Sequence, residues 1–501
     1  MRESKQRSEL HKQIWGIANT LRGAVEGWDF RNYVLGFLFY RYISEDFADY
    51  AGSGYADASD SDAEKIKEKA LKEKGYFILP SELFKNVKAE ADRTKNIEKR
   101  IKSVFCSIEK SGPMMTGLFS QCDPESEKLG LSTEERRKNT IGLLRGIGDM
   151  KLDAEGDNKI DVFGDAYEYL ISMYASSAGK LGGECYSPQC LSRLTALIGL
   201  GGRKKVRSIY DPAAGSGSLL MQPVMMLGSG NIGAGVFCQD ISQVAIILSR
   251  MNMILHGLKG DQIHTAVGNT VTAPAKWGKE PFDLIVCNPP FSVSVTKEKA
   301  AELENDERFS PAGTFPPYRR VDMAFVMHCA SCLADDGTAA IICYPGILYR
   351  IGKEKEIRKY LADSGIIDAV IQLPKKMFFG TKSQVCLLVL RKERKDRSVL
   401  FADASSLYRK EGKNNILTES NIQELYRMYM DRNSLPEYAR LVSPEEIAEA
   451  EYNLLPSVYI SERKEDCDIT LREISEELEK TVKKEEELRR RIRDIVAQFP
   501  E

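Results

Sequence analysis

The stretch VRSIYDPAAGSGSLLMQPVMML, residues 206–227, decides the fold class of this 501-residue chain. Its apolar start predicts a buried strand, and its closing run LLMQPVMML predicts a helix. Between them, Gly215 and Gly217 predict a tight turn whose backbone a ligand can approach closely. Leu220 replaces the third glycine of the dinucleotide fingerprint, which disfavours a nicotinamide or flavin cofactor.

Further apolar runs alternate with helical patterns on both sides of this stretch. They read GVFCQD, HTAVGN, FDLIVCNPPF, GTAAIICYP, IIDAVIQLP and VCLLVLRK. Continuous apolar strands bounded by turns and separated by helices predict a mostly parallel sheet with both faces covered. Residues 156–400 are therefore predicted to form one α/β domain.

The flanking regions have a different texture. Residues 1–155 carry apolar residues at helical spacing, as in YVLGFLFYRYISEDF, and predict an all-helical domain. Residues 401–465 show a weaker pattern and are predicted as an extension or linker. Residues 466–501 predict a long charged helix whose apolar seam would meet a partner, or fold back on its own domain. That seam comprises Leu471, Ile474, Leu478, Leu488, Ile492 and Ile495, interrupted by Thr481 and Glu485.

Composition limits how the chain can work. Its 71 basic and 73 acidic residues leave a formal net charge of -2, whereas a protein that binds DNA unaided usually has a basic excess. Any DNA contact must then come from a local patch or a partner. The polar start carries no signal peptide, and no run is long enough for a membrane helix. Scattered cysteines in apolar runs predict reduced, packed thiols and a cytoplasmic location, and Cys329 and Cys332 read as core residues.

A carboxylate ends the second predicted strand. Asp240 closes the run GVFCQD, where a carboxylate can accept hydrogen bonds from both hydroxyls of an adenosine ribose. An Asp that merely opens the next helix is the alternative.

The sharpest motif is Asn288-Pro289-Pro290-Phe291, which closes the strand FDLIVC. Two prolines fix a rigid turn at the carboxyl edge of the sheet, where such sheets bind ligands. The Asn288 amide oxygen and a nearby backbone carbonyl can accept two hydrogen bonds from one NH2 group, and Phe291 can lie against an aromatic ring. Such acceptors favour attack of that nitrogen on an electrophilic methyl group.

Together, these motifs resemble the S-adenosylmethionine-dependent amino-methyltransferases. Upstream lies Gly182-Gly-Glu-Cys-Tyr-Ser-Pro-Gln189, which is similar to the Gly-Glu-Phe-aromatic-Thr-Pro segment of adenine methyltransferases. This order is the gamma arrangement of DNA amino-methyltransferases. Nearly the whole chain resembles the modification subunit of type I restriction-modification systems, including DVFGDAYEYLI, DERFSPAG, DMAFVMH and LPKKMFFGTKSQVCLLVL. The resemblance implies a Rossmann-like, mostly parallel seven-stranded sheet.

The resemblance also implies residue roles. Asn288, Pro289, Pro290 and Phe291 would bind a flipped target adenine, whose amino group must leave the duplex to react. The cofactor S-adenosylmethionine would be bound by Glu184, Cys185, Tyr186, Ser187, Pro188, Gln189, Asp211, Gly215, Ser216, Gly217, Ser218, Asp240 and Asn269. No metal is implied. Cys185, Ser187 and Asn269 depart from the residues usual in the family, but none removes a needed group.

The expected activity is transfer of a methyl group to the N6 amino group of adenine in double-stranded DNA. The chain has no target-recognition domain of its own, so a separate specificity subunit would choose the site. The assembly would hold a second copy of this chain, and an ATP-dependent restriction subunit would complete it. The alternatives are a protein-glutamine methyltransferase and an inactive scaffold. The polar stretch 296–320 is either a lid over the base or an ordinary surface insertion.

Overall fold

The computed structural model describes residues 12–14, 16–17, 27–150, 163–164, 166–167, 169–170, 187–278, 280–378, 384–412, 414–433, 435, 437–460, 479, 482–483 and 485–491. Residues 1–460 form one compact unit and residues 461–501 a second. No helix in these ranges is both long and apolar enough to cross a membrane.

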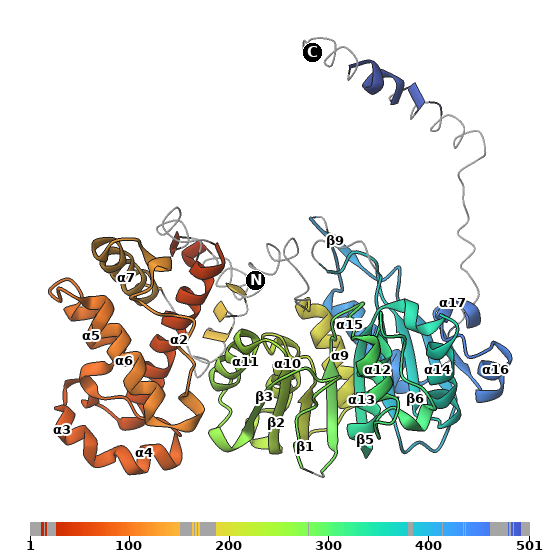
Figure 1. Ribbon diagram of the computed structural model, residues 1–501, viewed down its shortest axis with the longest axis horizontal. Coiled ribbons are helices and arrows are strands. Elements are labelled where there is room, and N and C mark those ends of the chain that lie inside the picture. Colours follow the sequence, from red (N-terminus) through yellow and green to blue (C-terminus); the bar gives the residue numbers. More distant parts are fainter. Residues whose placement is uncertain are drawn as a thin grey trace. The chain divides into compact units, whose positions relative to one another are not determined.

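Helices alone build the N-terminal region (Figure 1). Apolar residues repeat at intervals of three and four along α6, so one face is buried, through Ile97, Ile101, Val104, Phe105 and Ile108. A capping box between Ser132 and Glu135 starts α7. The helices are α2 (Gly27–Ala51), α3 (Asp60–Ala63), α4 (Lys67–Glu73), α5 (Phe84–Glu90), α6 (Ile97–Ser111) and α7 (Thr133–Gly148). This confirms the helical prediction over the described residues.

A nine-stranded sheet follows, in the order β11-β8-β6-β7-β5-β4-β1-β2-β3. β7 is antiparallel to both neighbours and β11 to β8, while the other pairs are parallel. The strands are β1 (Val206–Asp211), β2 (Ile232–Asp240), β3 (Ile263–Val267), β4 (Phe282–Cys287), β5 (Leu333–Cys343), β6 (Ile367–Gln372), β7 (Cys386–Arg391), β8 (Val399–Asp403) and β11 (Ala439–Val442). A separate hairpin joins β9 (Arg409–Glu411) to β10 (Asn414–Ile416).

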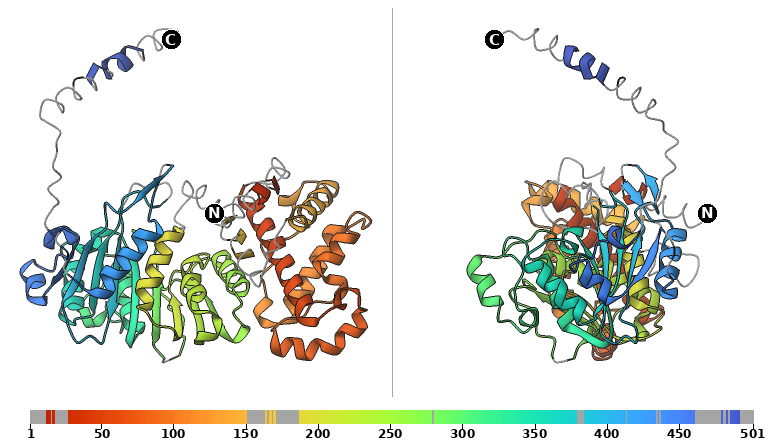
Figure 2. Two further views of the ribbon diagram at one scale, coloured as in Figure 1. Left: turned by 180° about the vertical axis from the view of Figure 1, so that it is seen from behind. Right: turned by 90° about the vertical axis from the view of Figure 1, so that its right-hand side faces the viewer.

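Helices cover both faces of the sheet (Figure 2). Side chains alternate along β4, so Leu284 and Val286 enter one apolar core while Ile285 and Cys287 enter the other. Near-complete burial of both faces explains why these strands read as continuous apolar runs. The helices are α9 (Gln189–Leu200), α10 (Ser218–Leu227), α11 (Gln243–Leu255), α12 (Lys297–Leu303), α13 (Asp322–Cys332), α14 (Lys353–Asp363), α15 (Glu419–Asp431), α16 (Pro444–Glu449) and α17 (Pro456–Tyr459).

The α/β class is confirmed, but the sheet has two strands more than the seven expected. β8 and β11 extend it beyond β6, and β11 lies within the stretch 401–465, predicted as an extension. Their physical role is to satisfy the backbone groups that an open edge at β6 would expose.

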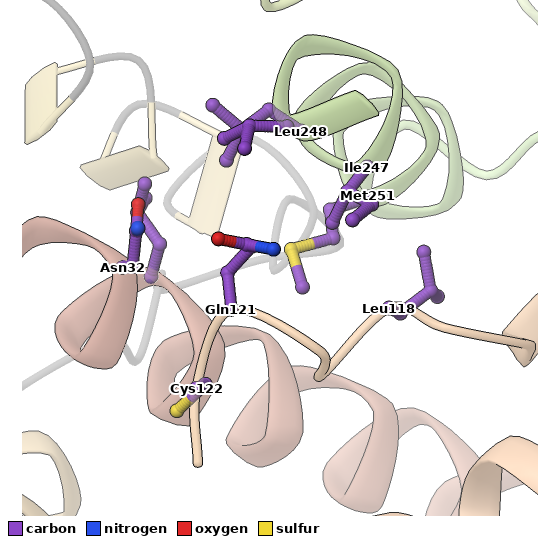
Figure 3. A pocket seen from close by; sticks show the side chains of 9 residues that line it. Asn32, Leu118, Gln121, Cys122, Ile247, Leu248 and Met251 are labelled. Atoms are coloured by element: carbon purple, nitrogen blue, oxygen red, sulfur yellow. The ribbon is translucent and has the colours of Figure 1, made fainter. Parts of the chain in front are cut away.

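Helix α11 belongs to two cores. Its residues Ile247, Leu248 and Met251 pack within the apolar core of the helical region, whereas Ile246 and Met253 pack against the sheet. Figure 3 shows the small pocket where α11 faces Leu118 and Cys122 of the helical region. Arg250 of α11 also donates to the backbone oxygens of Met114 and Thr116, at 2.5 and 2.8 Å.

The second unit contains helical residues among 479–491. There Glu485 and Glu487 pair with Arg489 and Arg491 one turn later, and Leu488 is exposed. Of the predicted seam, Leu471, Ile474, Leu478, Thr481, Ile492 and Ile495 lie outside the described residues.

Candidate active site

The glycine-rich loop between β1 and α10 adopts the predicted tight turn. Gly215 and Gly217 have φ angles of 54° and 79°, which disfavour a side chain. A Cβ atom at Gly217 would lie 3.2 Å from Ser249 Oγ, whereas one at Gly215 would meet no described atom within 4 Å. The backbone at Gly215 therefore faces open space, as close approach of a ligand requires.

Two side chains of helix α11 bind the backbone of this loop. Ser249 Oγ donates to the Gly215 oxygen at 2.8 Å, and Asn252 Nδ2 donates to the Ser216 oxygen at 3.3 Å. Both side chains are fully buried. Sequence reasoning missed these two residues, although a serine and an asparagine three positions apart in an otherwise apolar helix were a usable signal.

Asp240 stands at the carboxyl end of β2, beside the loop. Its Oδ2 accepts from the Gly215 amide at 2.9 Å, and its Oδ1 accepts from the Ser242 amide at 2.8 Å. Each carboxylate oxygen keeps a second lone pair for a hydroxyl group. The next residue, Ile241, is 70% exposed and was not singled out from the sequence.

Asp211, by contrast, is buried beneath the turn. Its Oδ1 accepts from the Ala213 amide at 2.9 Å. Burial, and to a smaller extent the nearby charge of Asp240, raise the pKa of this carboxyl to about 8. In this structure Asp211 supports the loop from within, and its contact with a cofactor stays a prediction.

The raised pKa of Asp211 predicts a pH-dependent stability. The unfolded chain loses this proton near pH 4 and the folded chain near pH 8, so the folded state binds more protons in that window. The free energy of unfolding should therefore fall by up to about 1.4 kcal/mol per pH unit across it. Asp211→Asn removes this titration but keeps the acceptor for Ala213. In urea unfolding, the free energy of unfolding of the variant should rise relative to that of the unmodified chain as the pH increases from 5 to 8. A difference in unfolding free energy that does not change with pH would contradict the prediction.

Asn288 is the most informative side chain of the site. It is 7% exposed, and its Nδ2 donates to Ser187 Oγ at 2.9 Å. Its Oδ1 is buried without a hydrogen-bond partner among the described residues. An unsatisfied buried acceptor costs about 1–3 kcal/mol, which suggests that a ligand completes it. The predicted acceptor for an NH2 group is therefore present, and the bond to Ser187 directs the amide oxygen.

Aromatic rings surround the residue that follows the two prolines. The ring of Phe291 lies 6.5 Å from that of Tyr344 and 6.4 Å from that of Phe378, measured between centroids. Sequence reasoning quoted the motif that contains Phe378 but gave neither partner a role. Behind the turn, the Ser292 amide donates to Asp322 Oδ1 at 2.7 Å, which fixes a left-handed φ of 59° at Ser292.

The loop after β3 carries Asn269. Its Oδ1 accepts from the Val271 and Thr272 amides at 3.0 and 3.2 Å. Thr270 Oγ1 donates to the Pro212 oxygen at 2.6 Å, which joins this loop to the glycine-rich loop. Arg308 holds the same loop from the stretch 296–320, by donating to the Thr270 and Val271 oxygens at 2.8 and 2.7 Å.

That stretch is partly built into the fold. Phe309 and Phe315 are fully buried in the same core as Ile285 and Cys287. The segment from Arg308 to Phe315 is therefore anchored in the domain by these two rings, and a lid function of the stretch 296–320 stays a prediction.

The cysteine pair of α13 has a packing role. Cys329 is buried, and His328 accepts or donates a hydrogen bond with the Tyr210 hydroxyl at 3.0 Å. Burial lowers the pKa of His328 to about 3, so its ring stays neutral. Over the part of the chain that the structure describes, no cluster of three or more His, Cys, Asp or Glu residues could hold a metal ion.

The structure thus brings most of the predicted residues to one sheet edge. Asp211, Asp240 and the loop Gly215, Ser216, Gly217 and Ser218 form one group, and Asn288 meets Ser187 in a second. Pro188 and Gln189 start α9, next to Ser187. Glu184, Cys185 and Tyr186 lie outside the described residues. An open glycine turn, a carboxylate at the next strand end and an orphan buried acceptor fit S-adenosylmethionine beside an amine.

Comparisons with known proteins identify the family of this chain. The family model for N-6 DNA methylase matches residues 158–468, and that for the HsdM N-terminal domain matches residues 10–146. The chain is 37% identical to the type I restriction enzyme MpnII methylase subunit of Mycoplasma pneumoniae, over 99% of this chain and 97% of that protein. A 26% identity links it to the type I restriction enzyme MjaIX methylase subunit of Methanocaldococcus jannaschii, over 97% and 91% of the two chains.

One solved structure is similar over most of its length. The type I restriction-modification system methyltransferase subunit from Streptococcus thermophilus superposes with a TM-score of 0.83 and 30% identity. The match covers 91% of this chain and all of that one.

Proposed function

Because this chain belongs to the N-6 DNA methylases, and within them to the methylase subunits of type I restriction enzymes, we propose that Asn288 and Phe291 bind an adenine flipped out of double-stranded DNA. The chain is an S-adenosylmethionine-dependent, adenine-specific DNA methyltransferase. The orphan Oδ1 of Asn288 is the observation that supports the assignment of residues.

The chemistry needs few groups. S-adenosylmethionine supplies an electrophilic methyl group when bound. Asn288 Oδ1 accepts a hydrogen bond from the adenine amine, which localises the nitrogen lone pair for attack in line with that methyl group. Phe291 lies against the base, and the rings of Tyr344 and Phe378 support Phe291. As the N–C bond forms, the C–S bond to the methyl group breaks and leaves S-adenosylhomocysteine. The extra proton on the amine then passes to water, so no general base is needed.

The cofactor contacts follow from the same edge of the sheet. Asp240 accepts hydrogen bonds from the ribose hydroxyls with its remaining lone pairs, and the exposed Ile241 packs against the adenine of the cofactor. Gly215, Ser216, Gly217 and Ser218 line the pocket, with Asn269 near the cofactor's adenine. Residues 184–189 and Asp211 complete it, with Asp211 acting through the loop it supports.

The partners follow from what the chain lacks. Its formal net charge of -2 provides no general affinity for DNA, so a specificity subunit selects the site and contributes DNA contacts. A second copy of this chain and an ATP-dependent restriction subunit complete the assembly. The free cysteines, several of them buried, support a cytoplasmic location. The family match favours DNA over a protein glutamine as substrate, and the preserved Asp240 and Asn288 disfavour an inactive scaffold.

Labelled S-adenosylmethionine and mixed-sequence DNA test the proposal. The chain alone and the chain with its specificity subunit are incubated with both, and the DNA is analysed for N6-methyladenine. We expect label in adenine, and only when the specificity subunit is present. Cofactor binding without DNA labelling under either condition would favour the protein-substrate or scaffold alternatives.

Ser187 supplies a sharper test of how Asn288 is oriented. Ser187→Ala frees the Asn288 amide to rotate, so we expect the rate of methyl transfer to fall by up to about 100-fold, as misplacement of a positioning group can cause. Ser187→Thr keeps the hydroxyl and should retain most activity. The cofactor dissociation constant is measured alongside, because a loss confined to cofactor binding would contradict an orienting role.

A further inference from the structure

The segment that follows β5 lies beside the proposed base pocket. Tyr344, its first residue, faces Phe291 at 6.5 Å between ring centroids. The chain then makes a short turn at Pro345–Leu348 and continues through Tyr349, Arg350 and Ile351 to Gly352, before α14 begins. We name residues 349–352 the tip. A duplex that delivers a base to Phe291 would pass over this edge of the sheet.

The tip is held rigidly from inside. Arg358 is only 2% exposed, yet its guanidinium donates to three backbone oxygens, those of Ile347, Arg350 and Tyr452, at 2.9, 2.7 and 2.8 Å. Burial lowers the pKa of Arg358 to about 10. Since burying a cation costs free energy, its use here indicates that the position of this surface turn matters.

Arg350 is the second residue that fixes the position of the tip. Its guanidinium lies 5.6 Å from the ring centroid of Tyr344 and 3.3 Å from Glu354 Oε1. Gly346 makes room, because a Cβ there would lie 2.5 Å from the Arg350 Nη2. The same arginine therefore connects the tip to the ring that faces Phe291.

On this rigid support the tip presents apolar side chains to solvent. Ile351 is 85% exposed, more than any other large apolar side chain of the described residues, and Tyr349 is 47% exposed. Gly352, with a φ of 74°, turns the chain back at once. An isoleucine with this exposure contributes little to the core, and its side chain is available for contact with a ligand.

The surroundings suggest what this ligand is. Arg319 and Arg320 are exposed, and the charge of Arg320 acts on Glu354, the partner of Arg350. Arginine side chains contact DNA phosphates and aliphatic side chains act as wedges in a base stack, so Arg320 near the start of α14 and Ile351 at the tip together suit DNA. A protein interface of ordinary size buries about 800 Å² on each partner, which a single side chain cannot supply.

We propose that Ile351 inserts into the duplex and occupies the space left by the flipped adenine, with Arg320 against the adjacent backbone. This inference rests on the proposed function. Ile351 is a positioning residue, because it acts on the base stack rather than on the reacting atoms. It stabilises the flipped state by replacing the stacking that the departing base loses.

The test uses the chain in complex with its specificity subunit and two DNA duplexes. In one the target adenine is paired with thymine, and in the other it faces an abasic site, so that it is already unpaired. For Ile351→Ala, single-turnover transfer to the paired adenine should slow by about tenfold or more, whereas transfer to the unpaired adenine should change less than about twofold. Ile351→Leu should restore most of the rate on the paired duplex.

Leu131→Ala is the matched control, because Leu131 is 82% exposed but lies in the helical region. It should leave both rates unchanged. An equal loss on both duplexes for Ile351→Ala would overturn the wedge, and so would an unchanged rate on the paired duplex. Loss of the specificity subunit from the variant, seen by size-exclusion chromatography, would instead assign Ile351 to a protein contact. Failure of the unmodified complex to methylate adenine would refute the proposed function itself.

Discussion

Replacing Asn288 by alanine is expected to abolish methyl transfer to DNA while leaving the affinity for S-adenosylmethionine nearly unchanged. The variant removes a buried acceptor that has no partner among the described residues and that belongs to the same turn as Phe291. Removing one preorganised hydrogen-bonding group from a reacting site costs about 100- to 1,000-fold in rate. Single-turnover transfer of labelled methyl groups, with the specificity subunit present, measures the effect.

The thermal stability of the variant shows whether the loss of methyl transfer results from misfolding. The unsatisfied Oδ1 of Asn288 costs folding free energy, so Asn288→Ala should melt within a few degrees of the unmodified chain. Asn139 is the matched control, since it is also 7% exposed and its Nδ2 donates to the Leu129 oxygen at 2.7 Å. Asn139→Ala should lose about 1 kcal/mol of stability but keep its activity. Substantial methylation by Asn288→Ala would sink the assignment.

Asp240→Ala should raise the dissociation constant of S-adenosylmethionine by about 100-fold, because hydrogen bonds to a charged group contribute about 1.5–3 kcal/mol each. Isothermal titration calorimetry on the chain without DNA measures it. The carboxylate also holds the Gly215 amide, so part of the loss comes from the loop. A cofactor analogue without ribose hydroxyls separates the two contributions: its affinity should fall much less between the unmodified chain and the variant.

Asp403 provides the matched control for this variant. It ends a parallel strand, as Asp240 does, and its Oδ1 accepts from the amide two residues later, that of Ser405, at 2.8 Å. Asp403→Ala should leave the cofactor affinity unchanged. An unaltered dissociation constant for Asp240→Ala would show that the ribose role is wrong.

How much of the fold the sequence predicts depends on burial. All seven apolar runs became strands. Most of them are buried on both faces and are therefore apolar along their length, whereas β3, at one edge, is only partly buried. β8 is buried and apolar from residue 399 to residue 402, but it was not predicted because the apolar pattern weakens from about residue 400. β11 is a four-residue strand at the edge of the sheet. In β11 the exposed Arg440 stands between Ala439 and Leu441, so that strand carries no continuous apolar signal.

The site divides in the same way. Residues that act through a local motif, such as Gly215, Asp240 and Asn288, were found because a strand end and a turn constrain their residue types. Contacts across the fold were not: Ser187 was predicted to bind the cofactor, but its hydrogen bond to Asn288, 101 positions away, was not foreseen. Ser249, which reaches Gly215 over 34 positions, was not singled out at all. No local pattern records such pairs. Ile351 was missed because a single exposed isoleucine has no periodicity.

The position of α11 has a consequence for how the protein unfolds. Because one helix contributes Leu248 to the core of the helical region and Ser249 to the support of Gly215, the two regions cannot melt independently. Residues 1–460 should behave as a single cooperative unit in calorimetry, with equal van't Hoff and calorimetric enthalpies. A truncation that began at residue 187 would expose Ile247, Leu248 and Met251 to water and would be prone to aggregation. The α/β region therefore needs the helical N-terminal region in order to fold stably.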